Sequence, residues 1–501
     1  MQFSYWKNQN FYILSITAIA AVAVGVASLL LPPQMIIIAA VAIIGAGIVL
    51  NYPEFGFLAI LVFLSSVLSE ESIPTVQAGP VQVYITDVIM LFLLVIMLVR
   101  LLVDPNFKLE FSPMSLPLFV FWGFALLSTI LGILGGNVII GRGLHEMRIV
   151  SYYLLFFLFI HLIREKKQLE RTLDWLFLLA TITAAATLAQ YILGDTFVFL
   201  EGRVEPFSPE NQAMANVIRV TDNPGEGLIT TAFIVLTIRL FLSQLKFKNI
   251  YQFFQWAILG GAMLIGFNRT HWAVAAISLA ITFFMTNLEQ RKKILTWSLY
   301  LLWLLPIVIL PGLIMPDSPY GQLVQAAFVR LTSLFTTQSY VDPTESTIVW
   351  RNFEYMYGIP QLLNHPFFGL GMGAFYRPFI SKIDGYGNMG PHYTHNGHLW
   401  VAMKGGLLTW LALMAFLTIF IVQGLKKWRQ VTDPGMQSLA LGFTLVGFSV
   451  IIASILHPII ITLFWTPLLG IIFAINHVIF KLYTEDTDNP QTEALPAGYQ
   501  T

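Results

Sequence analysis

The fold is decided by stretches such as residues 85–103, which read ITDVIMLFLLVIMLVRLLV. A helix needs roughly 20 apolar residues to cross a bilayer, and this stretch supplies them with few charges. Some neighbouring stretches are shorter, so about 12–14 spanning helices are expected. The hydropathy of the whole chain predicts spanning segments at about 12–31, 33–50, 55–69, 85–103, 114–134, 149–163, 173–193, 227–243, 250–267, 271–287, 294–315, 396–423, 438–456 and 458–478.

The composition also indicates a membrane protein. Of the 501 residues 56% are hydrophobic and 11% are charged, whereas soluble domains average about 25% charged residues. Cysteine is absent, which excludes disulfides, thiolate metal sites and a cysteine nucleophile. We therefore expect an all-α polytopic integral membrane protein. Its expected parts are transmembrane helices over 1–315, a large outer loop with amphipathic helices over 316–395, further transmembrane helices over 396–480 and a disordered cytoplasmic tail over 481–501.

The basic residues divide unevenly between the two sides of the predicted membrane. With a cytoplasmic N-terminus, 17 of the 27 lysines and arginines lie inside, and 11 of those 17 are lysine, as the positive-inside rule favours. Eight of the ten outer basic residues are arginine. Arginine grips phosphate with two parallel hydrogen bonds and keeps its charge when partly buried. The outer face is therefore expected to handle a phosphorylated compound.

The densest polar motif is PHYTHNGH, residues 391–398, at the junction of the large loop and a predicted membrane helix. Histidine accepts and donates protons near neutral pH, so His395 is the candidate catalytic residue. Asn396 is expected to cap the helix or bind a sugar hydroxyl. Two alternatives stay open: the histidines are harmless interface residues, or His392, His395 and His398 bind zinc, although no fourth ligand is evident nearby.

Arginines at the outer boundary are candidate ligands for the phosphorylated compound. Arg269 lies in Asn268-Arg-Thr-His-Trp272, between two membrane helices with almost no loop, where an ionisable residue is costly and suggests function. The alternative is that Arg269 only snorkels to lipid headgroups. His271 is expected to support the site rather than to catalyse.

Three further arginines have local alternatives as well. Arg351 lies on a predicted amphipathic helix with Glu354 three residues later, so an exposed helix pair is the other interpretation. Arg142 and Arg148 flank His145 and Glu146. An anionic ligand explains their outer position, and a local ion pair of Glu146 with Arg142 or Arg148 explains it equally well.

The glycine-rich segment Gly369-Leu-Gly-Met-Gly373 does not indicate a nucleotide-binding loop. No predicted strand precedes it and no Lys-Ser/Thr follows it, so the context that such fingerprints require is missing. Glycines that permit tight turns between helices of the loop are the expected explanation.

These motifs, in this order, resemble the O-antigen ligase and polymerase superfamily. The run from Trp350-Arg through His365-Pro-Phe-Phe-Gly-Leu-Gly-Met-Gly-Ala-Phe375 and His395-Asn to Gly405-Gly-Leu-Leu408 is similar to its signature. Asn268-Arg-Thr-His-Trp272 is similar to its "SRG-aromatic" motif, with Asn268 in place of serine and Thr270 in place of glycine. The resemblance covers about 265–410.

The resemblance implies a GT-C-like, metal-independent, inverting membrane glycosyltransferase without a cofactor. Its expected partners are a glycan donor linked to polyprenyl diphosphate, a lipid A–core or polysaccharide acceptor and membrane lipids, and no nucleic acid. It implies His395 as the group that activates the acceptor hydroxyl and Arg269 and Arg351 as diphosphate ligands. Arg142 and Arg148 join them as candidates, and Asn396 and His271 are candidates to contact the acceptor or to support the site. The expected location is the bacterial inner membrane, with the site facing the periplasm.

Two other functions compete with this one. Some members of the superfamily are described as inorganic-carbon transport proteins, so a small-solute transporter is the main alternative. A transporter is expected to carry ionisable residues near the bilayer midplane, whereas the predicted span 438–456 has none and the span 271–287 has only His271, at its outer end. A structural protein of a polysaccharide export machine is the third possibility, and it leaves His395 and the outer arginines without a role.

Overall fold

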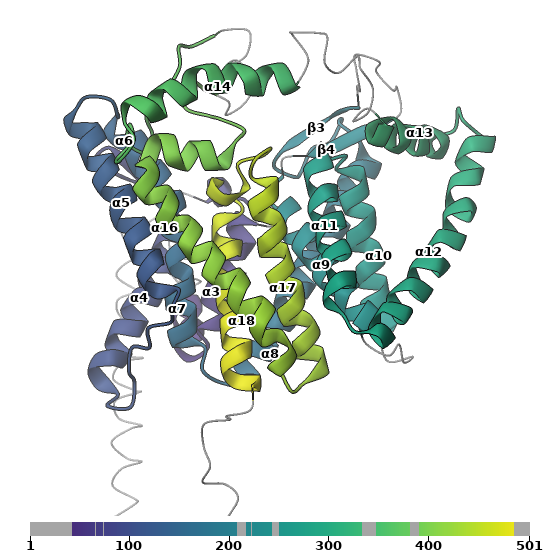
Figure 1. The fold of residues 1–501 in the computed structure, drawn as a ribbon, viewed down its shortest axis with the longest axis horizontal. Coiled ribbons are helices and arrows are strands. Elements are labelled where there is room, and N and C mark those ends of the chain that lie inside the picture. Colours follow the sequence, from purple (N-terminus) through teal and green to yellow (C-terminus); the bar gives the residue numbers. More distant parts are fainter. Residues whose placement is uncertain are drawn as a thin grey trace, which may run out of the picture.

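The protein is almost entirely helical, as expected. The computed structural model describes residues 43–65, 67–73, 75–207, 217–221, 223–242, 250–332, 347–380 and 390–484. Within these residues the strands form two short antiparallel hairpins, β1 (Val76–Ala78) with β2 (Val81–Val83) and β3 (Arg203–Pro206) with β4 (Ile218–Thr221). The all-α polytopic class is confirmed (Figure 1).

Eight helical runs in the described residues are long and apolar enough to cross a membrane. One of them, Ile140–Leu162, joins α6 (Ile140–Ser151), the 3₁₀ turn η2 (Tyr152–Leu154) and α7 (Leu155–Leu162). The other seven are α4 (Ile85–Val103), α5 (Ser115–Leu134), α8 (Lys166–Leu193), α12 (Leu288–Ile314), α16 (Gly397–Lys427, continued by η6 Trp428–Gln430), α17 (Pro434–Ala453) and α18 (Thr466–Tyr483).

Shorter helices fill the remaining predicted spans. They are α3 (Glu54–Leu64), α9 (Glu226–Leu242), α10 (Ile250–Ile265) and α11 (Arg269–Met285). The predicted segment 12–31, most of the segment 33–50 and the tail beyond Thr484 lie outside the described residues. The two amphipathic helices expected in the large loop are present as α13 (Pro319–Thr332) and α14 (Thr347–Asn364).

Two predicted boundaries are wrong. The segment expected at 149–163 begins at Ile140, because Glu146 and Arg148, whose polarity ended the hydropathy segment, are both paired inside the protein. The segment expected at 458–478 begins at Thr466. Residues 454–465 form turns and the 3₁₀ turn η7 (Ile459–Ile461) instead.

The core lies where α17 and α18 meet their neighbours. Helix α17 contacts α9, α11, α16 and α18, and nearly all of α18 is buried. Small residues allow this close approach, as is typical inside membranes. A Cβ added to Gly442 of α17 would lie 3.2 Å from Val235 of α9, and one added to Gly447 would lie 2.5 Å from Phe420 of α16.

Hairpin β3–β4 lies with α13 and α14 at one end of the bundle, at the top in Figure 1. Hairpin β1–β2 contacts α6, and the connection 454–465 contacts α14 and the start of α16, at the same end. We call this end the loop face. Helices α9, α11, α16 and α18 begin at it, while α5, α10, α12 and α17 end at it. The expected alternation of the connections is therefore present, and the candidate arginines Arg142, Arg269 and Arg351 belong to elements of this face.

Helix α16 is broken near its start. Gly406 has φ 84° and ψ 167°, a conformation that glycine adopts without steric cost. The break frees the carbonyl groups of the preceding turn, and buried carbonyls need hydrogen-bond partners. Ser128 of α5 donates to the carbonyl of Lys404 at 2.6 Å, and the remaining partners come from the glycine-rich segment.

Residues 366–376, here called the glycine strap, supply these partners. The backbone N–H groups of Leu370 and Gly371 donate to the carbonyls of Met403 and Lys404 at 3.0 and 2.9 Å. Gly369, Gly371 and Gly373 all have positive φ, and a Cβ on Gly369 would lie 2.3 Å from the carbonyl oxygen of Lys404. The expectation that these glycines permit tight turns is confirmed, and the strap fixes the start of α16.

Candidate functional site

His395 is held by a buried carboxylate from another helix of the loop face. Glu354, on α14, is 4% exposed. Its Oε1 lies 2.7 Å from Nδ1 of His395. Its Oε2 accepts hydrogen bonds from the backbone N–H of His395 at 2.8 Å and from the hydroxyl of Thr394 at 3.0 Å. One carboxylate therefore fixes both the turn before α16 and the histidine ring.

This contact decides which nitrogen of His395 is available for chemistry. A carboxylate only accepts hydrogen bonds, so Nδ1 of His395 carries a hydrogen and donates it to Glu354. In a neutral ring Nε2 is then the acceptor nitrogen. The side chain is 23% exposed, so part of it is accessible from outside the protein. A carboxylate in this position also stabilises the ring once it has gained a proton.

Sequence reasoning missed this role of Glu354. The local pair of Arg351 with Glu354 was the open alternative, but no ion pair of these two residues is among the salt bridges of the described residues, and Glu354 binds His395 instead. The two partners are 41 positions apart, so no local spacing reveals the pair. The only signal in the sequence was an acidic residue, Glu354, on a helix expected to be amphipathic.

Arg351 lies beside this pair. Its Nη2 donates to the carbonyl of Leu456 at 2.9 Å, while its Nε is buried and has no hydrogen-bond partner among the described residues. Burial lowers the pKa of Arg351, and the nearby charge of Glu354 opposes that shift. A half-buried guanidinium with an unused donor is suited to receive an anion.

Asn396 performs the predicted capping role. Its side-chain oxygen accepts from the backbone N–H of Leu399 at 3.0 Å, and its amide donates to the hydroxyl of Tyr355 at 3.1 Å. Asn396 thus ties the start of α16 to α14, which supports the positions of Glu354 and His395. The alternative contact with a sugar hydroxyl remains a prediction.

The other two histidines of the motif have different surroundings. His398 uses both ring nitrogens, Nε2 toward the carbonyl of Ile451 at 2.9 Å and Nδ1 toward the indole of Trp410 at 3.3 Å. Burial and the charge of Lys404 lower the pKa of His392 to about 4. Since the three histidines have separate partners, they do not converge. Within the described ranges no three histidines or acids are grouped to hold a metal.

Arg148 is occupied by carboxylates. Its Nε donates to Asp87 at 2.7 Å, and its Nη2 binds Glu70 and the hydroxyl of Thr86. Its Nη1 is buried and has no hydrogen-bond partner among the described residues, but the carboxylates of Glu70 and Asp87 already balance the charge of the guanidinium. The geometry therefore favours a structural role for Arg148, which joins α6 to α4 and to the loop before β1.

Arg142 and Glu146 do not form the local pair that was left open. The guanidinium of Arg142 lies over the ring of Phe375 in the glycine strap, 4.0 Å from its centroid. Glu146 pairs with the buried Lys404 of α16 and accepts from the indole of Trp400 at 3.2 Å. These contacts join α6 to the first segment of α16.

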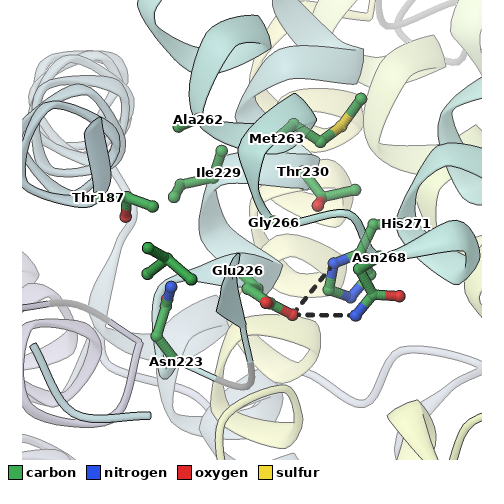
Figure 2. A pocket seen from close by; sticks show the side chains of 11 residues that line it. Thr187, Asn223, Glu226, Ile229, Thr230, Ala262, Met263, Gly266, Asn268 and His271 are labelled. Carbon is green, nitrogen blue, oxygen red and sulfur yellow. Dashed lines mark hydrogen bonds and ion pairs between the residues drawn. The ribbon is translucent and has the colours of Figure 1, made fainter. Parts of the chain in front are cut away.

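A second cluster surrounds the start of α11. Asn268 caps this helix by accepting from the backbone N–H of Thr270 at 3.1 Å, and its amide donates to Glu226 at 3.1 Å. Nδ1 of His271 lies 3.3 Å from the same carboxylate (Figure 2). Glu226 begins α9, so His271 supports the joint between two helices. Arg269, the first residue of α11, is placed by that joint.

Two arginines that were not among the predicted ligands join Arg269. Arg219, on β4, has its Nε 3.4 Å from the carbonyl oxygen of Gly266 and its Nη1 3.9 Å from the carboxylate of Glu205. The Nε of Arg330, on α13, donates to the carbonyl of Phe267 at 3.0 Å. Burial and the charges of Arg269 and Arg219 lower the pKa of Arg330 to about 9. We call Arg219, Arg269 and Arg330 the arginine triad.

The connection 454–465 borders both clusters. Its Leu456 carbonyl receives Arg351, and its Ser454 carbonyl receives the backbone N–H of Gly397 at 2.8 Å. At its other end the ring of Trp465 lies 5.7 Å from the ring of His271, centroid to centroid. One short segment therefore links the histidine site to the helix that carries Arg269.

Residues 254–414 match the family described as O-antigen ligase. This match confirms the resemblance to the O-antigen ligase and polymerase superfamily. None of the curated proteins compared with the chain matches it. The family supports a ligase-like or polymerase-like function in polysaccharide biosynthesis, for a chain with several membrane-spanning helices.

The O-antigen ligase match includes most of both clusters. It runs from α10 to the middle of α16 and contains Arg269, Arg330, Arg351, Glu354 and His395. The arginines at 142, 148 and 219 precede it.

Proposed function

We propose that the protein transfers a glycan from polyprenyl diphosphate to an acceptor hydroxyl on the loop face. The observation that carries the proposal is the accessible His395 ring held by the buried carboxylate of Glu354. General bases must lie within hydrogen-bond reach of the proton they remove and have an unprotonated acceptor nitrogen. In the neutral ring, Nε2 of His395 meets the second condition, because Nδ1 carries the hydrogen that is donated to Glu354.

The proposed reaction is a single displacement. Nε2 of His395 accepts the hydroxyl proton, and the acceptor oxygen forms a bond to the anomeric carbon. The bond from that carbon to the diphosphate oxygen breaks, and its electron pair leaves with the diphosphate. One displacement inverts the configuration at that carbon, and no metal takes part in the steps assigned to these residues.

The negative charge that develops on the leaving diphosphate needs stabilisation. Arginines placed in advance at the site of developing charge lower the barrier most effectively. Arg351 has an unused donor beside the histidine site, and Arg269 belongs to the arginine triad. We assign the diphosphate to these two residues, with Arg142 as a further candidate at the glycine strap. The proposed acceptor is a lipid A–core sugar or another polysaccharide repeat.

The proposed location is the bacterial inner membrane with the loop face in the periplasm. The positive-inside rule supports this orientation, because lysines such as Lys166, Lys292 and Lys427 belong to the opposite ends of α8, α12 and α16. A donor that is anchored in the membrane also explains why no nucleotide-sugar fingerprint is needed in the chain.

Purified protein in liposomes provides the test. With a lipid-linked glycan donor and an acceptor, we expect glycan transfer and release of polyprenyl diphosphate in equal amounts. Donor and acceptor that both remain unchanged with folded protein would contradict the proposal. Glycan analysis of a deletion strain then separates the two acceptors: loss of attachment indicates a ligase, and loss of chain length indicates a polymerase.

A further inference from the structure

Helix α12 differs from the other long helices because its middle is uncovered. Of its 27 residues, only Ile294 near one end and Gly312 near the other are buried. In the described part of the chain, every residue from 302 to 311 is exposed. The side chains of successive helical residues point about 100° apart, so these ten residues together face every direction around α12. All sides of this stretch are therefore exposed, and one of them is the side toward the bundle.

Helix α12 is attached to the bundle at its ends. It diverges from α10 and α11 toward the loop face, where α13 leads back to them (Figure 1). Gly312 packs on Val324 of α13, and Ala326 of α13 packs in a small core with Phe207 and Phe267. We call the uncovered apolar stretch of α12, with α13 at its loop-face end, the opening.

The arginine triad lies at the end of the opening where α13 is located. It surrounds the turn before α11, where Phe267 is the only non-glycine residue with positive φ in the described ranges. Such strained backbone persists where the surrounding structure enforces it and is common at binding sites. Here it directs the consecutive carbonyls of Gly266 and Phe267 to Arg219 and Arg330, which holds three guanidinium groups close together despite their repulsion.

We propose that this opening binds the donor lipid, with the diphosphate on the arginine triad and the polyprenyl chain along the uncovered side of α12. This inference rests on the proposed function and adds Arg219 and Arg330 to its binding residues. Three clustered guanidiniums match the two linked phosphate groups better than the single phosphate of a bilayer lipid. A helix of this length spans about 40 Å, which gives a long isoprenoid chain an extended apolar track.

The absence of native cysteine allows a direct test on the full chain in lipid nanodiscs. Single cysteines at Leu302, Trp303, Leu304 and Leu305 sample every direction around α12 and receive a fluorophore. The probe is a glycan-free polyprenyl diphosphate with a nitroxide quencher at the end of its chain. We expect saturable quenching that is strongest at the one or two positions facing α10 and α11.

The headgroup contact is tested in the same labelled proteins. Arg330→Ala should raise the probe concentration needed for half-maximal quenching by about 10- to 150-fold, the usual effect of losing a charge-assisted hydrogen bond. Arg330→Lys keeps the positive charge but loses the planar, forked donors of the guanidinium. It should raise the half-maximal probe concentration less than Arg330→Ala does. Lys292→Ala, a loss of charge at the opposite end of α12, is the matched control and should leave it unchanged. A probe with an alcohol in place of the diphosphate should not saturate.

Equal, unsaturable quenching at all four positions, unaffected by Arg330→Ala and Arg330→Lys, would overturn the inference and assign the opening to ordinary lipid. The result is independent of catalysis. Saturable binding with an inactive wild-type transferase would support the docking site and refute the proposed function. An active transferase without saturable quenching would refute the docking site alone.

Discussion

The histidine site and the arginine triad handle charge in opposite ways, although both lie on the loop face. At the histidine site a buried carboxylate, Glu354, binds His395 and lies near Arg351. At the triad, Arg219 and Arg330 bind backbone carbonyls, and their guanidiniums lie close to that of Arg269. The nearby carboxylate of Glu205, 3.9 Å from Nη1 of Arg219, is exposed rather than buried. The first arrangement is suited to proton transfer, and the second is suited to binding an anion. We propose a division of labour, in which His395 and Glu354 activate the acceptor while the triad, together with Arg351, binds the donor.

The largest expected effect is on His395. His395→Ala should lower turnover by about 10²–10⁴-fold, as expected for loss of a general base, and should leave unused lipid-linked donor in cells. His365, an exposed histidine after α14, is the matched control, and His365→Ala should retain activity. Activity should also survive a strong chelator. Normal turnover in His395→Ala, at normal expression, would remove the histidine from the mechanism.

Glu354→Gln should have the next largest effect, roughly 10²–10³-fold on turnover. The amide keeps the size of the side chain but loses the charge that stabilises the protonated ring. Glu354→Asp restores the charge at a longer distance and should recover part of the activity. Circular dichroism and thermal unfolding check that both variants are folded. Equal activity of the three proteins would reduce Glu354 to a packing residue.

Arginine-to-lysine changes should have smaller effects. Arg269→Lys and Arg351→Lys keep the charge but lose the planar fork that grips phosphate, so each should lower activity by about 10- to 150-fold. Arg148→Lys is an instructive contrast, because Arg148 is bound to Glu70 and Asp87. It should lower thermal stability more than activity. Full activity of both Arg269→Lys and Arg351→Lys would confine these arginines to the membrane boundary.

The smallest expected effect is a pH dependence of stability that involves His392. Burial and Lys404 lower its pKa from 6.5 to about 4, so the folded protein binds fewer protons than the unfolded chain between these values. Folding stability should therefore fall as the pH drops from about 6.5 to about 4. His392→Gln should weaken this fall in thermal-unfolding scans and change turnover at neutral pH little. An unchanged pH dependence in this variant would refute the role of His392.

Most of the bundle follows from local hydropathy, because a spanning helix is a continuous apolar run. The predicted segment 85–103 coincides with α4. The hydropathy prediction placed the start of the helical run 140–162 too late, at residue 149, because Glu146 and Arg148 are polar but paired across helices. A local scale assigns a polar residue to a loop unless its distant partner is known.

The candidate site was only partly predictable for the same reason. The motif around His395 and its capping Asn396 are local, and both were recognised. The contact of Glu354 with His395 joins two helices. The arginine triad draws Arg219, Arg269 and Arg330 from β4, α11 and α13, and no spacing in the sequence indicates that they meet around one strained turn.

The division of labour is tested most directly by two measurements on one pair of variants, Glu354→Gln and Arg330→Lys. Affinity for glycan-free polyprenyl diphosphate and turnover with the complete donor are measured side by side in liposomes. We predict that Glu354→Gln loses turnover with unchanged affinity, whereas Arg330→Lys binds the diphosphate more weakly. Weaker binding in Glu354→Gln with full turnover, or unchanged binding in Arg330→Lys, would contradict the account.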